Sequence, residues 1–395
     1  MRIPILPLVI LVAVSVCVDV YIDMVLTARC KKRWPSRVQE VMSVLLYGLL
    51  ATGLFMPMRE GSNSQLLDKM FVLFAFLTFL FPKILFTVID IIAKIPRAFK
   101  RPRLKWLSMS GAILAVLTFI GMWWGALFNR YNIDVVEQPV EIENLPAGFD
   151  GYRIVQISDL HVGSYGSDTA FVSKLVNRIN ALNPDVILFT GDIVNRQTDE
   201  LMPFVTTLSR LKARDGVYSI LGNHDYGDYY NWPSATAKQA NMQKLIDSQK
   251  QMGWNLLLND HDWLRRGRDS LLLIGVENVG DPPFTVYGDL RQAYSEIGDY
   301  NVKILMTHNP VHWDMDLQNN PESNIALTLS GHTHAMQISA GRLLSPAAFR
   351  YKHWGGMYTD TLGQRLYVNI GAGVVGLPMR FGATPEVTVF TLRRK

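Results

Sequence analysis

The chain has 395 residues, of which 49% are hydrophobic and only 18% charged, and its formal net charge is +5 at pH 7. This charged fraction is below the roughly 25% typical of soluble domains, which excludes a disordered chain and favours membrane segments. The charge is unevenly distributed: residues 1–130 carry +10, whereas residues 131–395 carry −5 and all eight histidines. The positive charge therefore does not indicate nucleic-acid binding, and no nucleic-acid partner is expected.

Four apolar stretches in the first 130 residues predict membrane-spanning helices, at residues 3–28, 38–58, 70–95 and 107–128. Each has about 20 residues or more, which is enough to cross a hydrocarbon core as a helix. The first is too long for the core of a signal peptide, so we expect it to be retained as an anchor. The predicted domains are a transmembrane domain at 1–130, a linker with an initial strand at 131–147, and a soluble domain at 148–395.

Loop charges predict the orientation of these helices. The first and third loops, with the adjoining helix ends, carry eleven Lys and Arg residues, whereas the second loop and the end of the fourth helix carry three. Because positively charged loops stay in the cytoplasm, both termini and the soluble domain are expected outside, on a bacterial cytoplasmic membrane.

Four charged residues lie within the predicted spans: Asp19, Asp23, Lys83 and Asp90. Charge inside a membrane can mark a lipid, ion or transport path. The alternative, which we favour, is an Asp–Lys ion pair that holds the bundle together, with Asp23 near the cytoplasmic edge.

From Gly151 onward, short apolar runs alternate with helical segments. Nine runs predict strands, at residues 153–158, 185–190, 217–221, 255–258, 271–276, 303–307, 325–329, 366–370 and 386–392. Apolar residues at helical spacing predict helices around 171–179, 201–208 and 234–252. The strand–helix order indicates an α/β fold, and the continuous Val/Ile/Leu runs indicate strands that are buried on both faces.

Five polar motifs directly follow predicted strands, where the carboxyl ends of an α/β sheet line a ligand crevice. They are Ser158-Asp159-Leu160-His161, Thr190-Gly191-Asp192, Leu221-Gly222-Asn223-His224-Asp225, Thr307-His308-Asn309 and Ser330-Gly331-His332-Thr333-His334. Carboxylates, imidazoles and one amide, without a thiolate, suit Mn²⁺, Fe or Zn²⁺ better than Ca²⁺. Seven candidate ligands exceed the needs of one ion, so we expect two divalent ions that share Asp192.

Each motif taken alone has a purely structural explanation. Asp159 or Asp225 could cap a helix, Asn223 could occupy a left-handed turn, and His308 could be a buried, hydrogen-bonded core residue. Five such motifs in order, each after an apolar run, favour a functional site instead.

The motifs Asp159-x-His161, Gly191-Asp192, Gly222-Asn223-His224-Asp225, His308 and Gly331-His332-x-His334 resemble those of calcineurin-like metallophosphoesterases, especially a membrane-anchored bacterial branch. The resemblance covers about residues 148–395 and implies a two-sheet β-sandwich flanked by helices. It also implies a dinuclear site: one metal would bind Asp159, His161 and His334, the other Asn223, His308 and His332, with Asp192 bridging them. His224 would lie beside the substrate phosphate, and Asp225 would orient its imidazole.

The resemblance implies a hydrolase that cleaves a phosphodiester or phosphomonoester through metal-bound hydroxide. We expect a cell-envelope or lipid-linked substrate and contact with membrane lipids. Two alternatives are a UDP-2,3-diacylglucosamine-type pyrophosphatase, which needs a cytoplasmic site, and a non-enzymatic membrane scaffold or sensor.

Two details stand apart from the motifs. Ala335-Met336-Gln337 follows His334 where the family branch often has Gly-Gly-Gln, so the loop is bulkier and more apolar. Arg380 could reach the substrate phosphate, but the interpretation that we favour is a solvated surface residue.

Overall fold

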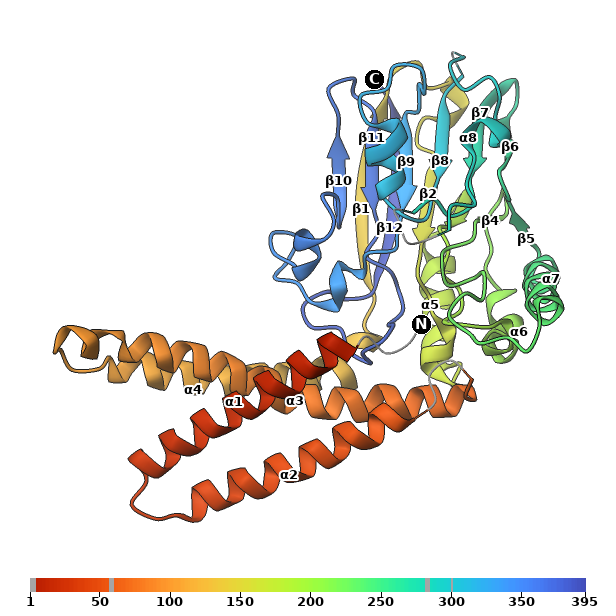
Figure 1. Cartoon of the computed structure of the whole chain (residues 1–395). Coiled ribbons are helices and arrows are strands. Elements are labelled where there is room, and N and C mark those ends of the chain that lie inside the picture. Colours follow the sequence, from red (N-terminus) through yellow and green to blue (C-terminus); the bar gives the residue numbers. More distant parts are fainter. Residues whose placement is uncertain (1–4, 57–59, 281–284, 300) are drawn as a thin grey trace. The chain divides into compact units, whose positions relative to one another are not determined.

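The computed structural model describes residues 5–56, 60–280, 285–299 and 301–395, and it divides the chain into two compact units (Figure 1). The first, here called the helical unit, comprises Met1–Pro57 and Asp68–Ala126. The second, the sheet unit, comprises Met58–Leu67 and Leu127–Lys395. The chain thus crosses between the units three times.

Four long helices account for the helical unit: α1 (Ile5–Arg29), α2 (Trp34–Phe55), α3 (Asn63–Lys94) and α4 (Lys105–Leu127). All four are long and apolar enough to cross a membrane, as the sequence predicts. Helices α2 to α4 begin two to seven residues before the predicted spans, because helical structure continues into polar residues that the apolar pattern leaves out. Residues 3, 4, 57 and 58 of the predicted spans lie outside the described residues.

Three of the four charged residues within the predicted spans form ion pairs. Lys83 Nζ lies 2.8 Å from Asp19 Oδ1, which confirms the predicted Asp–Lys pair. The fully buried Asp90 lies 2.5 Å from Arg29 Nη2 and 3.2 Å from Lys94 Nζ. Asp23 accepts a hydrogen bond from Ser36 near the end of α1.

The sheet unit contains two six-stranded mixed sheets. The first has the order β1 (Asp134–Ile142), β12 (Glu386–Arg394), β2 (Arg153–Ile157), β3 (Val186–Phe189), β4 (Val217–Ser219), β5 (Trp254–Leu256). The second has the order β10 (Gly356–Thr359), β11 (Arg365–Val368), β9 (Leu327–Ser330), β8 (Lys303–Met306), β7 (Asp269–Gly275), β6 (Asp260–Arg266). β2 to β5 are mutually parallel, as are β7, β8, β9 and β11.

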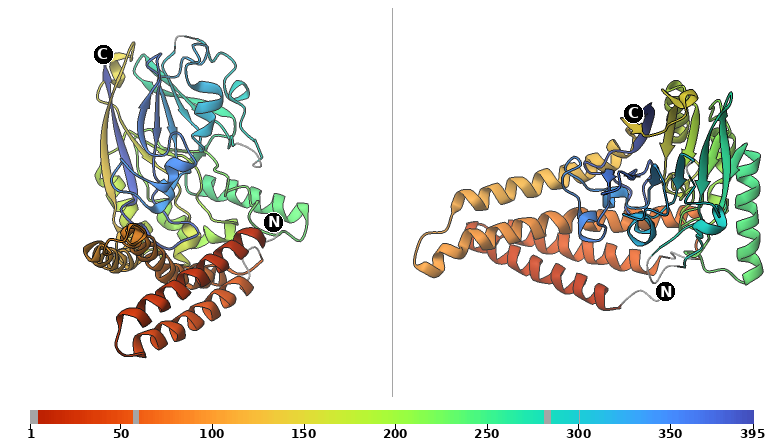
Figure 2. Two further views of the ribbon diagram at one scale, coloured as in Figure 1. Left: turned by 60° about the vertical axis from the view of Figure 1, so that its left-hand side comes forward. Right: turned by 90° about the horizontal axis from the view of Figure 1, so that it is seen from above.

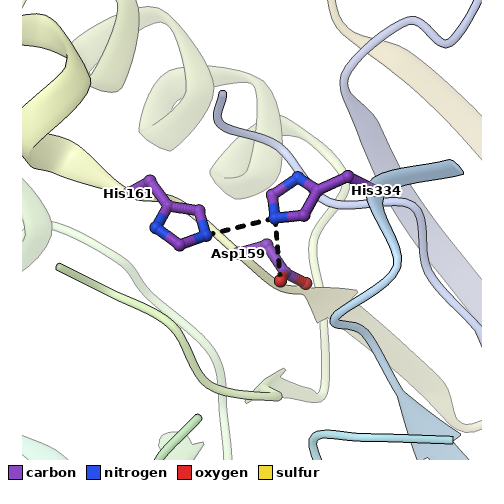
Figure 3. A group of neighbouring side chains, drawn as sticks. All are labelled: Asp159, His161 and His334. Carbon is purple, nitrogen blue, oxygen red and sulfur yellow. Dashed lines mark hydrogen bonds and ion pairs between the residues drawn. The ribbon is translucent and has the colours of Figure 1, made fainter. Parts of the chain in front are cut away.

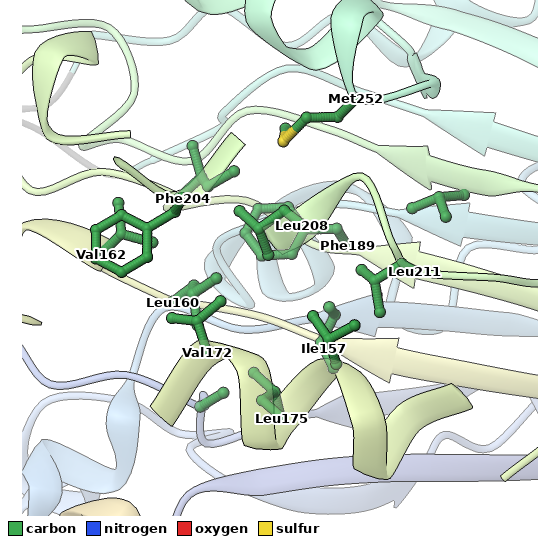
Figure 4. Close-up of a cluster of buried hydrophobic side chains, with 14 of the residues drawn as sticks. Ile157, Leu160, Val162, Val172, Leu175, Phe189, Phe204, Leu208, Leu211 and Met252 are labelled. Atoms are coloured by element: carbon green, nitrogen blue, oxygen red, sulfur yellow. The ribbon is translucent and has the colours of Figure 1, made fainter. Parts of the chain in front are cut away.

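Apolar residues are buried on both faces of these sheets. In β3, Val186 and Leu188 belong to one core cluster, whereas Ile187 and Phe189 belong to another. The second cluster (Figure 4) joins the first sheet to α5 (Ala170–Ala181), α6 (Val205–Leu208) and α7 (Ala235–Gln251), and α7 can be followed in Figure 2. Full burial of one such Leu or Val side chain contributes about 1.5–3 kcal/mol, so these layers hold the strand ends rigidly.

Two strands and one helix differ from the sequence expectation. β6 and β10 were not predicted; in β6 the adjacent Trp263 and Leu264 are the only apolar residues, and β6 lies at the edge of its sheet. The predicted helix at 201–208 is broken into short turns with α6 at its end. Pro203 explains the break, because proline lacks the N–H that a continuous helix needs.

Candidate metal centre

The five motifs reach one place from two sheets. The neighbouring parallel strands β2, β3 and β4 precede Asp159, Asp192 and Asn223, and the neighbouring parallel strands β8 and β9 precede His308 and His332. The sequence predicted convergence at the edge of one sheet, whereas the structure places the site where the carboxyl ends of two sheets meet. The His332 backbone N–H donates to Asp159 Oδ2 at 2.9 Å and so joins the two sheets.

Asp159, His161 and His334 form one group of potential metal ligands (Figure 3). His334 Nε2 lies 3.2 Å from Asp159 Oδ1 and 3.1 Å from His161 Nε2. All three residues are buried, and their ligand atoms lie within 4.8 Å of one another. This is the trio that the resemblance implies for the first metal.

Asp192, His308 and His332 form a second group that meets the same 4.8 Å limit. His308 Nε2 lies 3.2 Å from Asp192 Oδ2, 3.2 Å from Asn223 Oδ1 and 3.3 Å from His332 Nδ1. Asp192 also belongs to a third group, with His161 and His224. The carboxylate expected to bridge two ions therefore lies between the two sets of imidazoles.

Backbone carbonyls orient two of these imidazoles. His161 Nδ1 lies 3.1 Å from Val194 O and His308 Nδ1 lies 2.8 Å from Thr190 O. Because a carbonyl only accepts, each Nδ1 carries a proton and each Nε2 faces the interior of the site. Carboxylate oxygens and imidazole nitrogens gathered within 4.8 Å of one another form a donor set that fits a divalent metal.

Burial and mutual charge shift the pKa values across the site. Burial raises the pKa of Asp159 and Asp192, but histidine charges outweigh burial and hold both pKa values below their usual range. Burial opposes protonation of His308, yet the Asp192 carboxylate raises its pKa to about 9. Burial and the charge of His308 lower the pKa of His332 to about 3. Both carboxylates thus stay negatively charged at neutral pH, which favours a divalent cation beside them.

The backbone around the candidate ligands is strained. Five of the seven have positive φ, a region that non-glycine residues rarely adopt: Asp159 (53°), His161 (44°), Asp192 (61°), His332 (72°) and His334 (51°). The glycines of the motifs allow close approach, because a Cβ on Gly222 would lie 2.2 Å from Asp192 Oδ1 and one on Gly331 1.9 Å from Ser158 Oγ. Such strain persists only where the surrounding packing maintains it, and here the strained backbone orients the candidate ligands toward the site.

The predicted contact between Asp225 and the imidazole of His224 is wrong. His224 Nδ1 lies 2.6 Å from the carbonyl oxygen of Asn195, which takes the orienting role. Asp225 instead accepts backbone N–H groups from Asp192, Ile193, Val194 and Gly222. Burial raises the pKa of Asp225 to about 7. Asp225 therefore shapes the loop that carries Asp192.

The favoured interpretation of Arg380 as a surface residue is also wrong. Arg380 is fully buried; Nη2 lies 3.1 Å from His334 Nδ1, and Nε donates to Gly373 O at 2.8 Å. A guanidinium only donates, so Arg380 holds the far side of a candidate ligand. Its apolar neighbours Met379 and Phe381 are the sequence signal that could have indicated burial.

Two tyrosines near the site were not predicted. Tyr351 OH lies 3.2 Å from His332 Nε2. Tyr229 OH lies 2.9 Å from Asn223 Nδ2, and its ring stacks on His224 with centroids 4.2 Å apart. Both lie in loops without a recognisable motif, although Tyr229 follows His224 by only five residues.

Comparison with known proteins places these features in a family. Residues 1–130 match the family described as "Probable Calcineurin-like phosphoesterase, transmembrane domain", and residues 152–336 match "Calcineurin-like phosphoesterase". The chain is 31% identical over 302 residues to YkuE, an uncharacterized metallophosphoesterase of Bacillus subtilis, covering 72% of this chain and 95% of YkuE.

Similar proteins also occur in animals. The chain is 30% identical over 294 residues to a Danio rerio "Transmembrane protein with metallophosphoesterase domain", covering 73% of this chain and 64% of that protein, which is less than two thirds of its length. A solved structure of a dimetal phosphatase from Danio rerio is 12% identical, with a TM-score of 0.33, and covers 56% of this chain and 88% of that one.

Proposed function

We propose that this chain, which belongs to the calcineurin-like metallophosphoesterases, uses two divalent ions to cleave a lipid-linked or other envelope phosphoester outside the cytoplasmic membrane. Membership of this family makes it a metal-dependent phosphoester hydrolase with a transmembrane domain. The observation that carries the two-ion assignment is the convergence of two ligand groups on either side of Asp192. Manganese, iron and zinc all suit this set of oxygen and nitrogen donors.

The ligands divide between the ions as the family resemblance implies. Asp159, His161 and His334 would hold one ion, Asn223, His308 and His332 would hold the other, and Asp192 would serve both. When bound, two such ions activate water at neutral pH and neutralise charge on the phosphoryl oxygens. The chain contributes rigid strand ends, which position the ligands without further rearrangement.

His224 acts as the general acid. The Asn195 carbonyl, 2.6 Å from Nδ1, holds one N–H, so the protonated ring directs its Nε2–H toward the leaving oxygen. Asn removes this proton donor, so His224→Asn is expected to lower kcat about 10²–10⁴-fold on an alkyl phosphoester. A 4-nitrophenyl ester, whose leaving group needs no proton, should lose much less. Equal losses on both esters, or a loss of bound metal, would contradict the assignment.

Hydrolysis itself is tested with the purified full-length chain in detergent. Loaded with Mn²⁺, it should cleave activated mono- or diesters, and EDTA should abolish the activity. If no ester is cleaved with Mn²⁺, Fe²⁺ or Zn²⁺ although the metals bind, the domain is a scaffold or sensor, as in the non-enzymatic alternative.

The outward orientation rests on the eleven Lys and Arg residues of the first and third loops. A reporter enzyme that is active only outside the cytoplasm, fused after Lys395, should therefore be active. A cytoplasmic reporter would overturn the envelope assignment and favour the alternative, cleavage of a UDP-diacylglucosamine-type pyrophosphate.

A further inference from the structure

One segment of the sheet unit, residues 336–349, exposes four large apolar side chains and is here called the apolar segment. Phe349 is 97% exposed, Leu343 88%, Leu344 69% and Met336 42%. Isolated exposed apolar residues are ordinary on a protein surface, but larger groupings mark contact surfaces. Four of them within fourteen residues, directly after the candidate ligand His334, therefore need a partner.

The apolar segment is held in place by buried side chains and hydrogen bonds. Ala335 and Ala347 lie in one buried cluster with Trp354 and Ala383. Ser345 Oγ donates to Ala335 O at 2.6 Å, and Ala340 N donates to Leu344 O at 2.8 Å to close a tight turn. Small buried alanines beneath thus leave the large side chains of the segment no place inside, and they project outward.

Each end of the apolar segment is two residues away in the chain from a side chain of the metal centre. Met336 follows His334 by two residues and has φ +46°, so the strained backbone of the ligands continues into the segment. Phe349 precedes Tyr351 by two residues, and Tyr351 OH lies 3.2 Å from His332 Nε2. A molecule bound to the segment would therefore lie beside the site.

The apolar segment is also linked to the residues that follow the last membrane helix. α4 ends at Leu127, and Asn129 Nδ2 then donates to Arg380 O at 2.9 Å. The adjacent Phe381 donates its N–H to Gln337 O at 2.8 Å. Residue 129 follows the end of the last membrane helix by two residues, so two hydrogen bonds connect the apolar segment to the residues after that helix.

Charge around the apolar segment favours an anionic surface. Residues 335–359 contain Arg342, Arg350 and Lys352 but no Asp or Glu, although residues 131–395 as a whole carry −5. Glu386 lies 3.8 Å from Arg342 and Asp314 lies 3.6 Å from Lys352, and these acids offset part of the charge. Apolar side chains with basic neighbours are the composition of surfaces that insert among anionic lipid headgroups.

We propose that the apolar segment inserts into the headgroup layer of the bilayer and that the substrate is a phosphoester carried by a membrane lipid, which the segment delivers to the metal centre. The substrate class rests on the proposed phosphoesterase function, whereas the lipid contact does not. A soluble phosphoester would reach the same ions without using Leu343, Leu344 or Phe349.

Activity tests the substrate class. The full-length chain is reconstituted with Mn²⁺ in phosphatidylglycerol vesicles that contain phosphatidic acid, and L343S/L344S/F349S is compared with the matched control M315S/L362S, whose apolar side chains are exposed elsewhere in the sheet unit. The triple variant should release phosphate or diacylglycerol about tenfold more slowly, since it loses most of its apolar contact. Bis(4-nitrophenyl) phosphate turnover should stay within about twofold of the parent.

Each other outcome of the activity test is decisive. Equal losses on lipid and soluble ester would mean that the segment only supports the fold, and no loss on lipid would mean that it contacts none. A parent that cleaves the soluble ester but neither lipid would overturn the lipid substrate class. A parent that cleaves nothing would overturn the proposed function instead.

Lipid contact is measured without catalysis. The chain has two cysteines, so a Cys17→Ser/Cys30→Ser background allows one label at a time. Bimane at Leu343→Cys in phosphatidylglycerol nanodiscs should shift to the blue and be quenched by headgroup-proximal spin-labelled lipid, whereas bimane at Leu362→Cys should not. An equally exposed label at both positions would overturn the docking proposal even if hydrolysis is observed.

Discussion

Buried acids in the two units are balanced in different ways. In the helical unit, Asp19 pairs with Lys83, and Asp90 pairs with Arg29 and Lys94. In the sheet unit, the described contacts of Asp159 and Asp192 are with imidazoles and backbone N–H groups, and no Lys or Arg forms an ion pair with either. At these four acids the helical unit supplies Lys and Arg partners, whereas the sheet unit leaves charge that a bound cation can balance.

This contrast separates a structural ion pair from a binding site. A buried ion pair can be replaced by apolar residues at little cost, but removal of one partner leaves an uncompensated charge. A metal site behaves in the opposite way, because removal of one carboxylate relieves repulsion in the metal-free protein and abolishes binding. Substitutions in the two units should therefore differ in what they change.

The largest expected effect is in the sheet unit. Asp192→Asn should lower kcat by about 10³-fold or more and reduce bound metal, because it removes the ligand that both ions share. At a metal concentration about 100 times Kd the parent gains about 2.7 kcal/mol of stability, and the variant should gain little of this. Elemental analysis and melting with and without EDTA measure both effects. Equal metal content in the variant and the parent would remove the dinuclear assignment and the contrast with it.

In the helical unit the matched test is Lys83→Met. It removes the cationic partner of Asp19, which keeps hydrogen bonds from Gln39 and Tyr47, and should lower stability by about 1.5–3 kcal/mol. Adding Asp19→Asn should restore most of the loss. Neither change should alter metal content or kcat. The readout is thermal unfolding in detergent, together with hydrolysis at a permissive temperature. A double variant that is as unstable as the single one would show that the pair is not a self-contained structural element.

His312, a buried histidine that is not a candidate ligand, allows burial to be tested separately from metal binding in the sheet unit. Burial lowers the pKa of His312 to about 4, although Asp316 lies 3.7 Å away. Because its folded pKa is depressed, its contribution is fully present above pH 6.5 and is lost as the pH falls through 4, a total of about 3 kcal/mol. His312→Asn, which can keep a bond to Thr307, should flatten the melting temperature between pH 6.5 and 4 in EDTA. An unchanged slope would refute this assignment.

The smallest expected effect concerns the backbone beside the site. Ala335 and Met336 have φ values of +50° and +46°, where glycine is favoured. Met336→Gly should therefore stabilise the sheet unit by about 1 kcal/mol. Exposed Leu362→Gly, with no such strain at its position, provides the control and should be neutral or destabilising. A destabilised Met336→Gly would mean that contacts of the Met336 side chain outweigh the backbone strain.

Most of the architecture and the ligand set followed from local sequence. Apolar length predicted the four helices, and apolar runs that end in Asp, Asn or His predicted which strand ends would meet. These properties are visible in sequence because helix and strand periods repeat over neighbouring residues, and because metal chemistry restricts the residue types. Edge strand β6 was not predicted, because its charged residues obscure the apolar pattern of a strand.

Only the tertiary structure decided which groups hold the ligands. His224 is oriented by the carbonyl of Asn195 rather than by its neighbour Asp225, and Arg380 reaches His334 from 46 residues away. Any residue can supply a backbone carbonyl, and residue type does not distinguish a buried arginine from a solvated one. Neither contact can therefore be recognised from the sequence. The sequence by itself thus determined which side chains are candidate metal ligands, while packing between distant segments determined how these side chains are oriented.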